Sequence, residues 1–235
     1  MQYSLNIAHL YGDLMNTYGD IGNILVLQYF GKQMGVEVTS EVISLGDKFD
    51  PDKFDFAVFG GGQDFEQAII SPDLIETKKA DLTNFIEDGG SLLAICGGYQ
   101  LLGHYYIGAD GEKIPGIGAL NHYTEQQNDN RFIGDIVIQN SETGEKYHGF
   151  ENHQGITFLG DGEAPLGEVV EGHGNNGEDG TEGAIYKNVY CSYFHGPILA
   201  RNSQLAKRML LNALTRKYPD ADFSQIKEMT LPATY

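Results

Sequence analysis

The chain has 235 residues, enough for one large α/β domain or two small ones, and its hydrophobic content of 41% can supply a core. Its formal charge of −18 argues against sequence-independent nucleic-acid binding, which needs clustered Lys and Arg. Two cysteines cannot make a disulfide framework, and no apolar run is long enough to cross a bilayer. The first residues lack the basic and apolar parts of a signal peptide, so we expect a cytoplasmic protein without membrane insertion.

The N-terminal part of the chain alternates between strand and helix patterns. Short apolar runs are typical of buried parallel strands, and apolar residues on successive turns indicate helices. Pro72 is expected at the first position of a helix, where its missing N–H is not needed. The β-α-β-α-β-α order predicts a parallel sheet with right-handed crossovers. The expected strands are 3–10, 36–44, 55–59 and 91–95, and the expected helices are 20–33, 71–88 and one directly after residue 96.

The pattern changes after Gly103, where short alternating segments are separated by Gly, Asn and Asp. They predict antiparallel strands and hairpins that continue the sheet, with a loop over 174–180. We expect the last helix over 204–217 and a mixed tail, 220–235, that packs late or docks on another surface. Without a repeat or a linker, the chain is expected to form one domain, 1–235. The expected strands in this part include 132–138, 155–159, 183–186 and 189–194.

Cys96 lies between a predicted buried strand and a predicted helix. Gly97 and Gly98 let the backbone turn sharply and let a substrate approach closely. The side chain at the apex of such an elbow points out of the sheet, and the helix N-terminus favours a thiolate there. Cys96 is therefore a candidate nucleophile, although a buried structural cysteine is the commoner fate of a free thiol. Cys191, inside a predicted strand, fits that second description.

Two further segments are expected at the same edge of the sheet. The run Gly60–Gly62 follows a predicted strand, and its N–H groups with that of Gly97 can form an oxyanion hole; a plain tight turn is the alternative. His195 follows another predicted strand, where a general base can reach the thiol. A lone histidine is more often a packed or surface residue, but the apolar strand before it and Gly196-Pro197 after it favour a role in the site.

Together these motifs resemble those of class I glutamine amidotransferases, and more narrowly the cobyric-acid-synthase-like branch. The resemblance spans residues 5 to about 202 and implies an α/β fold, a flavodoxin-like three-layer sandwich with a mixed, mainly parallel sheet. Three further segments narrow it to glutaminase subunits that serve a Mur-ligase-like synthetase. The segments that carry the resemblance are Ile95-Cys96-Gly97-Gly98-Tyr99-Gln100, Gly60-Gly61-Gly62-Gln63-Asp64 and Phe194-His195-Gly196-Pro197, and the narrowing ones are Asn16–Asn23, Gly149–His153 and Gly174–Asn176.

The resemblance implies a glutaminase reaction. Cys96 would attack the side-chain amide of L-glutamine to give a thioester and ammonia, and His195 would activate first the thiol and then the water. Arg131 would hold the α-carboxylate, for which its planar, permanently charged guanidinium is suited. Without the resemblance, an ordinary surface arginine is the simpler interpretation of Arg131. The remaining residues implied in substrate binding are Gly61, Gly62, Gly97 and Gln100.

The same resemblance implies a partner. The chain has no G-x-x-x-x-G-K-[ST] segment, so ATP and Mg are expected on the synthetase subunit, which would convert the D-glutamate of the lipid II stem peptide to D-isoglutamine. No cofactor is expected in this chain, and the His and Cys spacings predict no metal. Pro197 stands where many class I amidotransferases have Glu, so the carboxylate that orients His195 is expected from an Asp of the partner.

Three alternatives stay open from the sequence: a stand-alone Cys hydrolase on a related sheet, an amidotransferase for a cobyrinate-like acceptor, and a non-catalytic interaction module. The glycine run and Arg131 argue against the first, and the presence of both Cys96 and His195 argues against the last.

Other polar residues have a weaker connection to the site. His153 is expected in a hydrogen-bonded turn or near the site. Asp20 and Asn23 are expected in the first turn of a helix, or at the rim of the pocket. The partner is expected to dock on the region 152–156 and the rim around Cys96.

Overall fold

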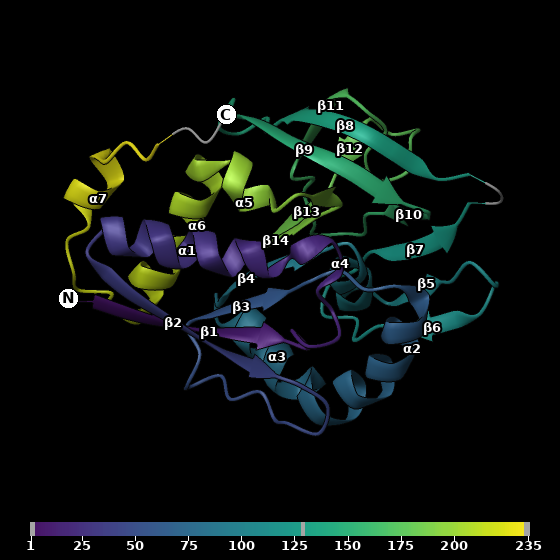
Figure 1. Ribbon diagram of the computed structural model, residues 1–235, viewed down its shortest axis with the longest axis horizontal. Coiled ribbons are helices and arrows are strands. Elements are labelled where there is room, and N and C mark those ends of the chain that lie inside the picture. The colour runs from purple at the N-terminus through teal and green to yellow at the C-terminus, as the bar shows by residue number, and fades with distance from the viewer. Residues whose placement is uncertain (1–2, 128–129, 233–235) are drawn as a thin grey trace.

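A six-stranded sheet forms the centre of the computed structural model, which describes residues 3–127 and 130–232 (Figure 1). The strand order is β13-β14-β4-β3-β1-β2; neighbouring strands are parallel except for β13, which is antiparallel to β14. The order β2-β1-β3-β4-β14 is that of a flavodoxin-like sheet, so the predicted mixed, mainly parallel sheet is confirmed. The bounds are β1 Tyr3–Leu10, β2 Val36–Ile43, β3 Phe56–Phe59, β4 Ser91–Ile95, β13 Ala184–Tyr186 and β14 Val189–Ser192.

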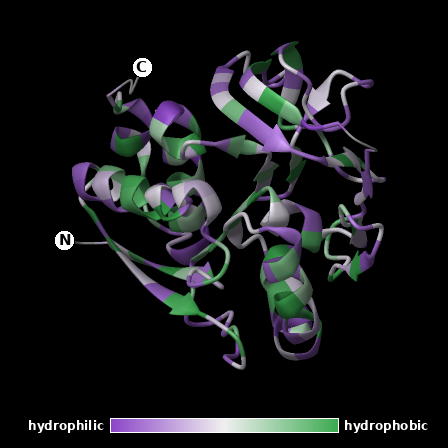
Figure 2. Cartoon of the chain, turned by 45° about the vertical axis from the view of Figure 1, so that its right-hand side comes forward, coloured by the Kyte–Doolittle hydropathy of each residue, from purple (hydrophilic) through white to green (hydrophobic). Residues whose placement is uncertain are grey.

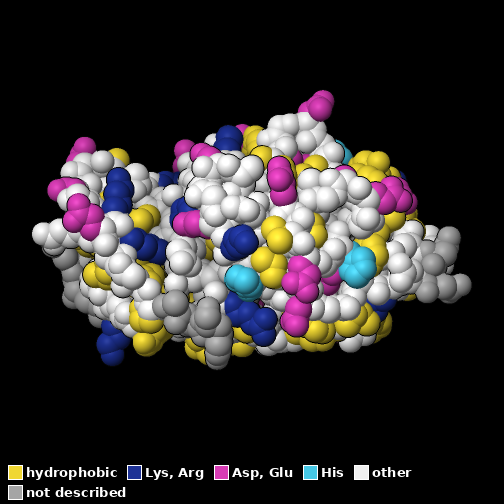
Figure 3. Space-filling model, turned by 90° about the horizontal axis from the view of Figure 1, so that it is seen from above, with side chains coloured by type: hydrophobic (Ala, Val, Ile, Leu, Met, Phe, Trp, Pro, Cys, Tyr) yellow, Lys and Arg dark blue, Asp and Glu magenta, His cyan; other side chains and the backbone are white. Residues whose placement is uncertain are grey.

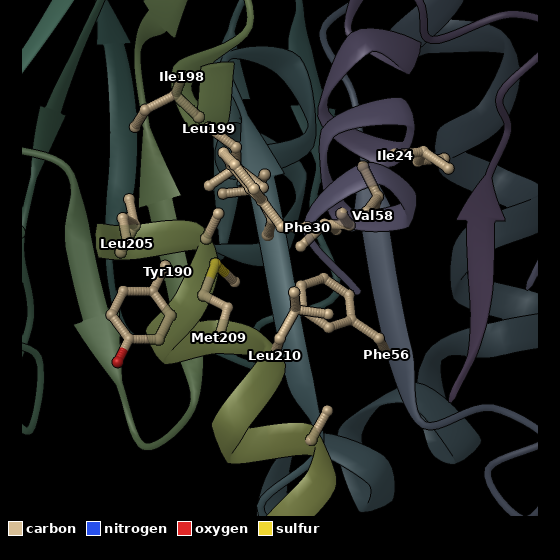
Figure 4. Close-up of a cluster of buried hydrophobic side chains, with 14 of the residues drawn as sticks. Ile24, Phe30, Phe56, Val58, Tyr190, Ile198, Leu199, Leu205, Met209 and Leu210 are labelled. Carbon is tan, nitrogen blue, oxygen red and sulfur yellow. The ribbon is translucent and has the colours of Figure 1, made fainter. Parts of the chain in front are cut away.

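Helices cover both faces of this sheet, which explains why its middle strands are apolar throughout. In β3, Phe56 and Val58 belong to one core cluster, while Ala57 and Phe59 belong to the other. Figure 4 shows the first cluster, in which side chains of α1 and α6 meet Phe56 and Val58. In Figure 2 the helices carry hydrophobic and hydrophilic segments side by side, as elements with one buried face should. The helices are α1 Ile21–Gln33, α2 Asp64–Asp73, α3 Lys79–Glu87, α4 Gly97–Leu102, α5 Ile198–Arg201, α6 Ser203–Lys217 and α7 Ser224–Glu228, with short turns η1 Thr17–Gly19 and η2 Leu74–Lys78.

The segments after Gly103 form two further sheets, so the prediction that they continue the central sheet is wrong for most of them. One sheet has the order β10-β7-β5-β6 and the other β12-β11-β8-β9-β15. Their strands alternate buried and exposed residues, as in β9, and therefore have one solvated face that a sheet covered on both sides would not allow. The bounds are β5 Tyr105–Ile107, β6 Lys113–Pro115, β7 Tyr123–Gln126, β8 Phe132–Gln139, β9 Lys146–His153, β10 Gly155–Phe158, β11 Gly167–Glu171, β12 Thr181–Glu182 and β15 Phe194–His195.

Strands β13 and β14 form an antiparallel pair that continues the central sheet, as expected, but β14 also runs parallel to β4 and is buried over its whole length. Strand β14 therefore ends at the edge of the central sheet where the parallel strands have their carboxyl ends. The chain then crosses to β15, which pairs with β9 in the five-stranded sheet. The predicted single strand 189–194 is therefore two strands in two sheets.

The predicted helix 71–88 begins earlier than expected, at Asp64, and Pro72 lies inside α2 rather than at its start. The carboxylate of Glu66 accepts the N–H of Gln63 and so satisfies a donor at the true N-terminus. Pro72 has no N–H for the carbonyl four residues earlier, and the α-helical pattern of α2 ends at the next residue, Asp73. The π-helical turn η2 follows directly and separates α2 from α3.

The C-terminal segment folds onto the body of the protein. The last helix is α7, not α6 as predicted, and the last three residues of the predicted tail lie outside the described residues. Phe223 packs against Tyr3 with ring centroids 5.1 Å apart, and Lys207 donates to the carbonyl oxygens of Lys227 and Met229. The predicted loop over 174–180 is confirmed.

Within the part of the chain that the structure describes, no helix has the length and apolarity needed to span a bilayer. Figure 3, which views the molecule from above Figure 1, shows acidic, basic and hydrophobic side chains mixed over this face, without segregation of one charge.

Candidate active site

Cys96 occupies the predicted elbow between β4 and α4. Its φ of +49° and ψ of −105° lie in a region that non-glycine residues rarely adopt, and such backbone strain is frequent at functional sites. The turn is fixed from both sides, because the Cys96 N–H donates to Ser192 O (2.9 Å) and the Gly98 N–H to Gly60 O (3.1 Å). Gly98 is required here, since a Cβ atom would collide with the carbonyl of Phe59.

The glycine run after β3 is held against this elbow. The Gly61 N–H donates to Asp20 Oδ2 (2.6 Å), and the Gly61 carbonyl accepts the N–H of Thr17 (3.0 Å). Gly61 therefore has no N–H to offer a substrate. The Gly62 nitrogen faces the elbow, because a Cβ atom at Gly97 would lie 3.0 Å from it. The geometry thus favours Gly62 and Gly97 as oxyanion donors over Gly61.

His195 lies next to Cys96, although it belongs to β15 of the five-stranded sheet. A Cβ atom at Gly61 would lie 3.3 Å from Cys96 Cβ, 3.5 Å from His195 Cε1 and 3.2 Å from Asp20 Oδ2, so these three side chains surround one point. The imidazole is buried, and neither of its nitrogens has a hydrogen-bond partner among the described residues. The ring of Tyr18 covers it, with centroids 4.4 Å apart.

Burial controls the protonation of the site. It raises the pKa of the Cys96 thiol to about 12, and the charge of Asp20 acts in the same direction. Burial lowers the pKa of His195 to about 4, with His153 and Arg131 adding to the effect. It also raises the pKa of Asp20 to about 7, although the Gly61 N–H stabilises the carboxylate. Cys96 and His195 are therefore both uncharged in this state, and proton transfer between them is unfavourable.

The elbow opens into a pocket of about 440 Å³ that brings together most of the predicted substrate-binding residues. The Arg131 guanidinium lies at its wall and donates to Asn152 Oδ1 (2.5 Å) and Asn152 O (3.3 Å). The Gln100 amide is held between Gln67 (3.0 Å) and the Tyr193 hydroxyl (3.2 Å). The predicted residues among those lining the pocket are Cys96, His195, Arg131, Gln100, Gly61 and Gly62.

Several site residues were missed or only partly anticipated. Asp20 lies within the buried centre of the site rather than only at a helix start or a rim. Tyr18, in the same segment 16–23, has a φ of +62° and accepts a hydrogen bond from Asn152 (2.8 Å). The only sequence signal for Asp20 and Tyr18 was that the segment 16–23 is one of the motifs that carry the resemblance. His153 fits both expectations, because it bonds the Gly155 carbonyl and also lines the pocket.

The second cysteine is packed in the core. Cys191 is fully buried in β14, opposite Ala184 of β13. Within residues 3–127 and 130–232, no group of three His, Cys, Asp or Glu side chains is arranged to hold a metal ion.

A parallel sheet with a cysteine elbow, an adjacent glycine run and a histidine at a neighbouring strand end defines an amidotransferase-type site. Residues 6–203 match the family model of the CobB/CobQ-like glutamine amidotransferase domain, and the chain belongs to this family.

Curated relatives narrow the comparison. The chain is 58% identical over 216 residues to the lipid II isoglutaminyl synthase (glutamine-hydrolyzing) subunit GatD of Streptococcus pneumoniae, covering 92% of this chain and 83% of that protein. It is 43% identical over 215 residues to the GatD subunit of Staphylococcus aureus, covering 92% and 86%. A probable cobyric acid synthase of Methanosphaera stadtmanae is 36% identical over 140 residues, which cover 53% of this chain and 28% of that protein.

Solved structures agree on the fold. A chain of PurLQS from Thermotoga maritima superposes with a TM-score of 0.58 at 17% identity, covering 92% of this chain and 99% of that chain. A glutamine amidotransferase from the same organism gives 0.53 at 14% identity, covering 92% and 84%. The predicted class I amidotransferase fold is thereby confirmed.

Proposed function

We propose that this chain is the glutaminase subunit of a lipid II isoglutaminyl synthase. The observation that carries the proposal is the meeting of Cys96 and His195 around Gly61, at the wall of a pocket that also contains Arg131. Two relatives at 58% and 43% identity, each aligned over 92% of this chain, bear the name of that subunit and support the choice of pathway. The whole chain, 1–235, would act as one amidotransferase domain, since the C-terminal helices share the core of the central sheet.

The geometry supports a two-step hydrolysis of L-glutamine. His195 takes the thiol proton as Cys96 Sγ attacks the side-chain amide carbon, and the N–H groups of Gly62 and Gly97 stabilise the oxyanion. The imidazolium returns the proton to the leaving nitrogen, which departs as ammonia and leaves a thioester on Cys96. A water molecule, deprotonated by His195, then attacks the thioester and releases glutamate and the free thiol. Arg131 holds the α-carboxylate throughout.

We propose that the partner, a MurT-like synthetase of the Mur-ligase type, completes this site. The low pKa of His195, about 4, and the high pKa of Cys96, about 12, oppose the first proton transfer in the isolated chain. A carboxylate placed against the imidazole by the partner would raise the pKa of His195 and favour the ion pair. Docking on the region 152–156 and the rim around Cys96 would bring it there, beside the exposed ring of Tyr18.

The partner would also supply the acceptor chemistry. It would bind ATP and Mg, activate the D-glutamate carboxyl of the lipid II stem peptide and receive the ammonia, giving D-isoglutamine for peptidoglycan synthesis. Both subunits would then work in the cytoplasm, where ATP is available.

Glutamate release from L-glutamine tests the proposal. The wild-type chain with the synthetase subunit should release glutamate, and Cys96→Ala should abolish the release. Cys191→Ala removes the other thiol and should leave it unchanged, because Cys191 is buried in β14. Release that persists in Cys96→Ala would contradict the nucleophile, and equal rates with and without the synthetase would contradict the incomplete site.

A further inference from the structure

The pocket beside Cys96 carries one charge of each sign. Among its described lining residues, Asp64 is the single carboxylate and Arg131 the single guanidinium or ammonium group. Asp64 and Arg131 both line the pocket into which Cys96 opens, whereas Asp20, which raises the pKa of the thiol more than Asp64 does, is not among the lining residues. An α-amino acid in its zwitterionic form also presents one charge of each sign. Arg131 can bind the carboxylate of such an amino acid, so the group that binds its ammonium must be another residue of the pocket.

Asp64 is fixed in place and has acceptor capacity left. It is the first residue of α2, and its carboxylate accepts the Tyr106 hydroxyl at Oδ1 (2.9 Å) and the Ala109 N–H at Oδ2 (2.7 Å). Both donors are neutral, so its negative charge is oriented but not compensated by them. An ionised carboxylate offers about four lone-pair sites, of which these bonds use two.

Gln67 provides a second acceptor next to Asp64. The two residues are three apart on α2, which places them on the same side of the helix. Gln67 Nε2 donates to Gly62 O (3.2 Å) and to Gln100 Oε1 (3.0 Å). Because a carbonyl oxygen can only accept, this bond fixes which end of the amide is Nε2. Gln67 is 2% exposed, and its Oε1 has no donor among the described residues although the side chain lines the pocket.

Buried acceptors without a donor are uncommon in folded proteins and destabilise them, so they are expected where a ligand supplies the donor. The Gln100 oxygen differs from that of Gln67, because it already accepts one hydrogen bond, from Gln67 Nε2, and so is not an acceptor without a donor. The N-terminus of α2 carries a partial positive charge that would repel a cation, but the Asp64 carboxylate places a full negative charge at the pocket wall.

We infer that Asp64 and Gln67 form an ammonium subsite that binds the α-amino group of the substrate while Arg131 binds its α-carboxylate. The inference rests on the proposed glutaminase function and adds its specificity. The pocket then selects free L-glutamine and rejects glutamine whose α-nitrogen is acylated, as in a peptide. It binds glutaramate, which is glutamine without the α-amino group, more weakly.

Calorimetric titration of the Cys96→Ala chain, in complex with the synthetase subunit, measures this without turnover. The chain should bind L-glutamine at least about tenfold more tightly than glutaramate, because hydrogen bonds to a charged group are lost with the amino group. Adding Asp64→Asn should weaken L-glutamine binding about tenfold or more and leave glutaramate binding unchanged. Retained glutaramate binding also shows that the pocket of this variant is folded.

Glu66→Gln is the matched control. Glu66 lies on the same turn of α2 and carries the same charge, but its carboxylate caps Gln63 and does not line the pocket. It should keep the preference for L-glutamine. A preference that survives Asp64→Asn, or that falls equally in Glu66→Gln, would overturn the inference.

A second variant tests the inference if Asp64→Asn does not fold. Gln67→Met removes the free acceptor and keeps the charge of Asp64. If Asp64→Asn binds neither compound, Gln67→Met must lower the ratio of the dissociation constants of glutaramate and L-glutamine. An unchanged ratio overturns the inference. Failure of the proposed glutaminase function gives a different result from failure of the ammonium subsite. In that case the complex binds no L-glutamine and the wild type releases no glutamate, whereas equal binding of both compounds with normal glutamate release contradicts the ammonium subsite alone.

Discussion

At the scale of single residues, Asp20 is the least expected part of the site. It is fully buried, its Oδ2 holds the Gly61 N–H, and its Oδ1 has no partner among the residues described. A carboxylate in this position stabilises the glycine run but disfavours a second negative charge on Cys96. Asp20 therefore adds to the effect of burial, which is the larger cause of the high pKa of the Cys96 thiol.

Asp20→Asn should lower the pKa of the Cys96 thiol. An asparagine oxygen can still accept the Gly61 N–H, but the negative charge that raises the pKa is gone, so the thiolate forms at lower pH. The rate of alkylation by iodoacetamide, measured against pH, should shift its midpoint downward by about one unit. Asp13→Asn, an exposed neighbour in the sequence, serves as control. An unshifted midpoint in Asp20→Asn would show that burial alone sets the thiol pKa.

The sequence was sufficient to predict that Cys96 and His195 lie close together, because each follows an apolar strand and precedes a turn residue. It was not sufficient for the position of Asp20. That residue enters the site only because β1 and β3 are neighbours in the sheet, which brings the segment after β1 onto Gly61. Such a contact depends on strand order and leaves no local pattern.

At the scale of elements, the α2–η2–α3 segment shows where local rules were overridden. Pro72 suggested a helix start, but the helix begins at Asp64, and a buried ion pair spans the π-turn after Pro72. Lys78 Nζ contacts Asp73 Oδ2 (2.6 Å), the Lys78 side chain is fully buried, and the Tyr11 hydroxyl donates to the same carboxylate (2.7 Å). The π-turn η2 includes Lys78, and both members of the ion pair contact Tyr11, the residue that follows β1.

Lys78→Ala should destabilise the protein by about 3 kcal/mol, because it leaves the Asp73 carboxylate largely buried without its cation. Urea unfolding at pH 7 measures the change. Lys79→Ala alters the next residue, which is exposed, and should change the free energy of unfolding by less than about 0.5 kcal/mol. Equal effects of the two substitutions would mean that the Lys78–Asp73 pair contributes nothing beyond helix propensity.

At the scale of the whole molecule, Glu182 lies where the two larger sheets meet. It belongs to β12 of the five-stranded sheet, and its carboxyl accepts the Tyr193 N–H (2.7 Å) and the Ser192 hydroxyl (3.1 Å) at the end of β14. Burial raises its pKa to about 8, and those two hydrogen bonds only partly oppose the rise. This carboxyl is therefore largely protonated at neutral pH.

Glu182→Gln should change how stability depends on pH. The folded chain binds this proton more tightly than the unfolded chain, whose Glu has a pKa near 4.5, so the stabilisation is complete below that value and is lost as the pH rises through about 8. Glutamine does not titrate. Between pH 5 and pH 9, the free energy of unfolding of the variant should therefore rise relative to that of the wild type by an amount on the order of 3 kcal/mol. Unfolding in urea at several pH values measures it.

Glu168→Gln is the control for this comparison, because Glu168 is exposed on the neighbouring strand β11. Parallel pH profiles for wild type and Glu182→Gln would contradict the high pKa of Glu182.

The connection between sheets also marks the limit of prediction for the fold. The central strands could be recognised from the sequence because burial on both faces leaves only apolar residues. The alternating strands after Gly103 carry no information about which sheet they join. Val189–Ser192 and Phe194–His195 read as one strand, yet they pair with β4 and β9 respectively.

This division has a consequence for how such an enzyme can be altered. Cys96 and its glycine run belong to one sheet, whereas His195 is carried by the edge strand of another, with Ser192 and Tyr193 as the bridge. The distance between the nucleophile and the base is therefore set by how the two sheets pack against each other. A small shift of the five-stranded sheet would move His195 relative to Cys96 without any change in the elbow itself.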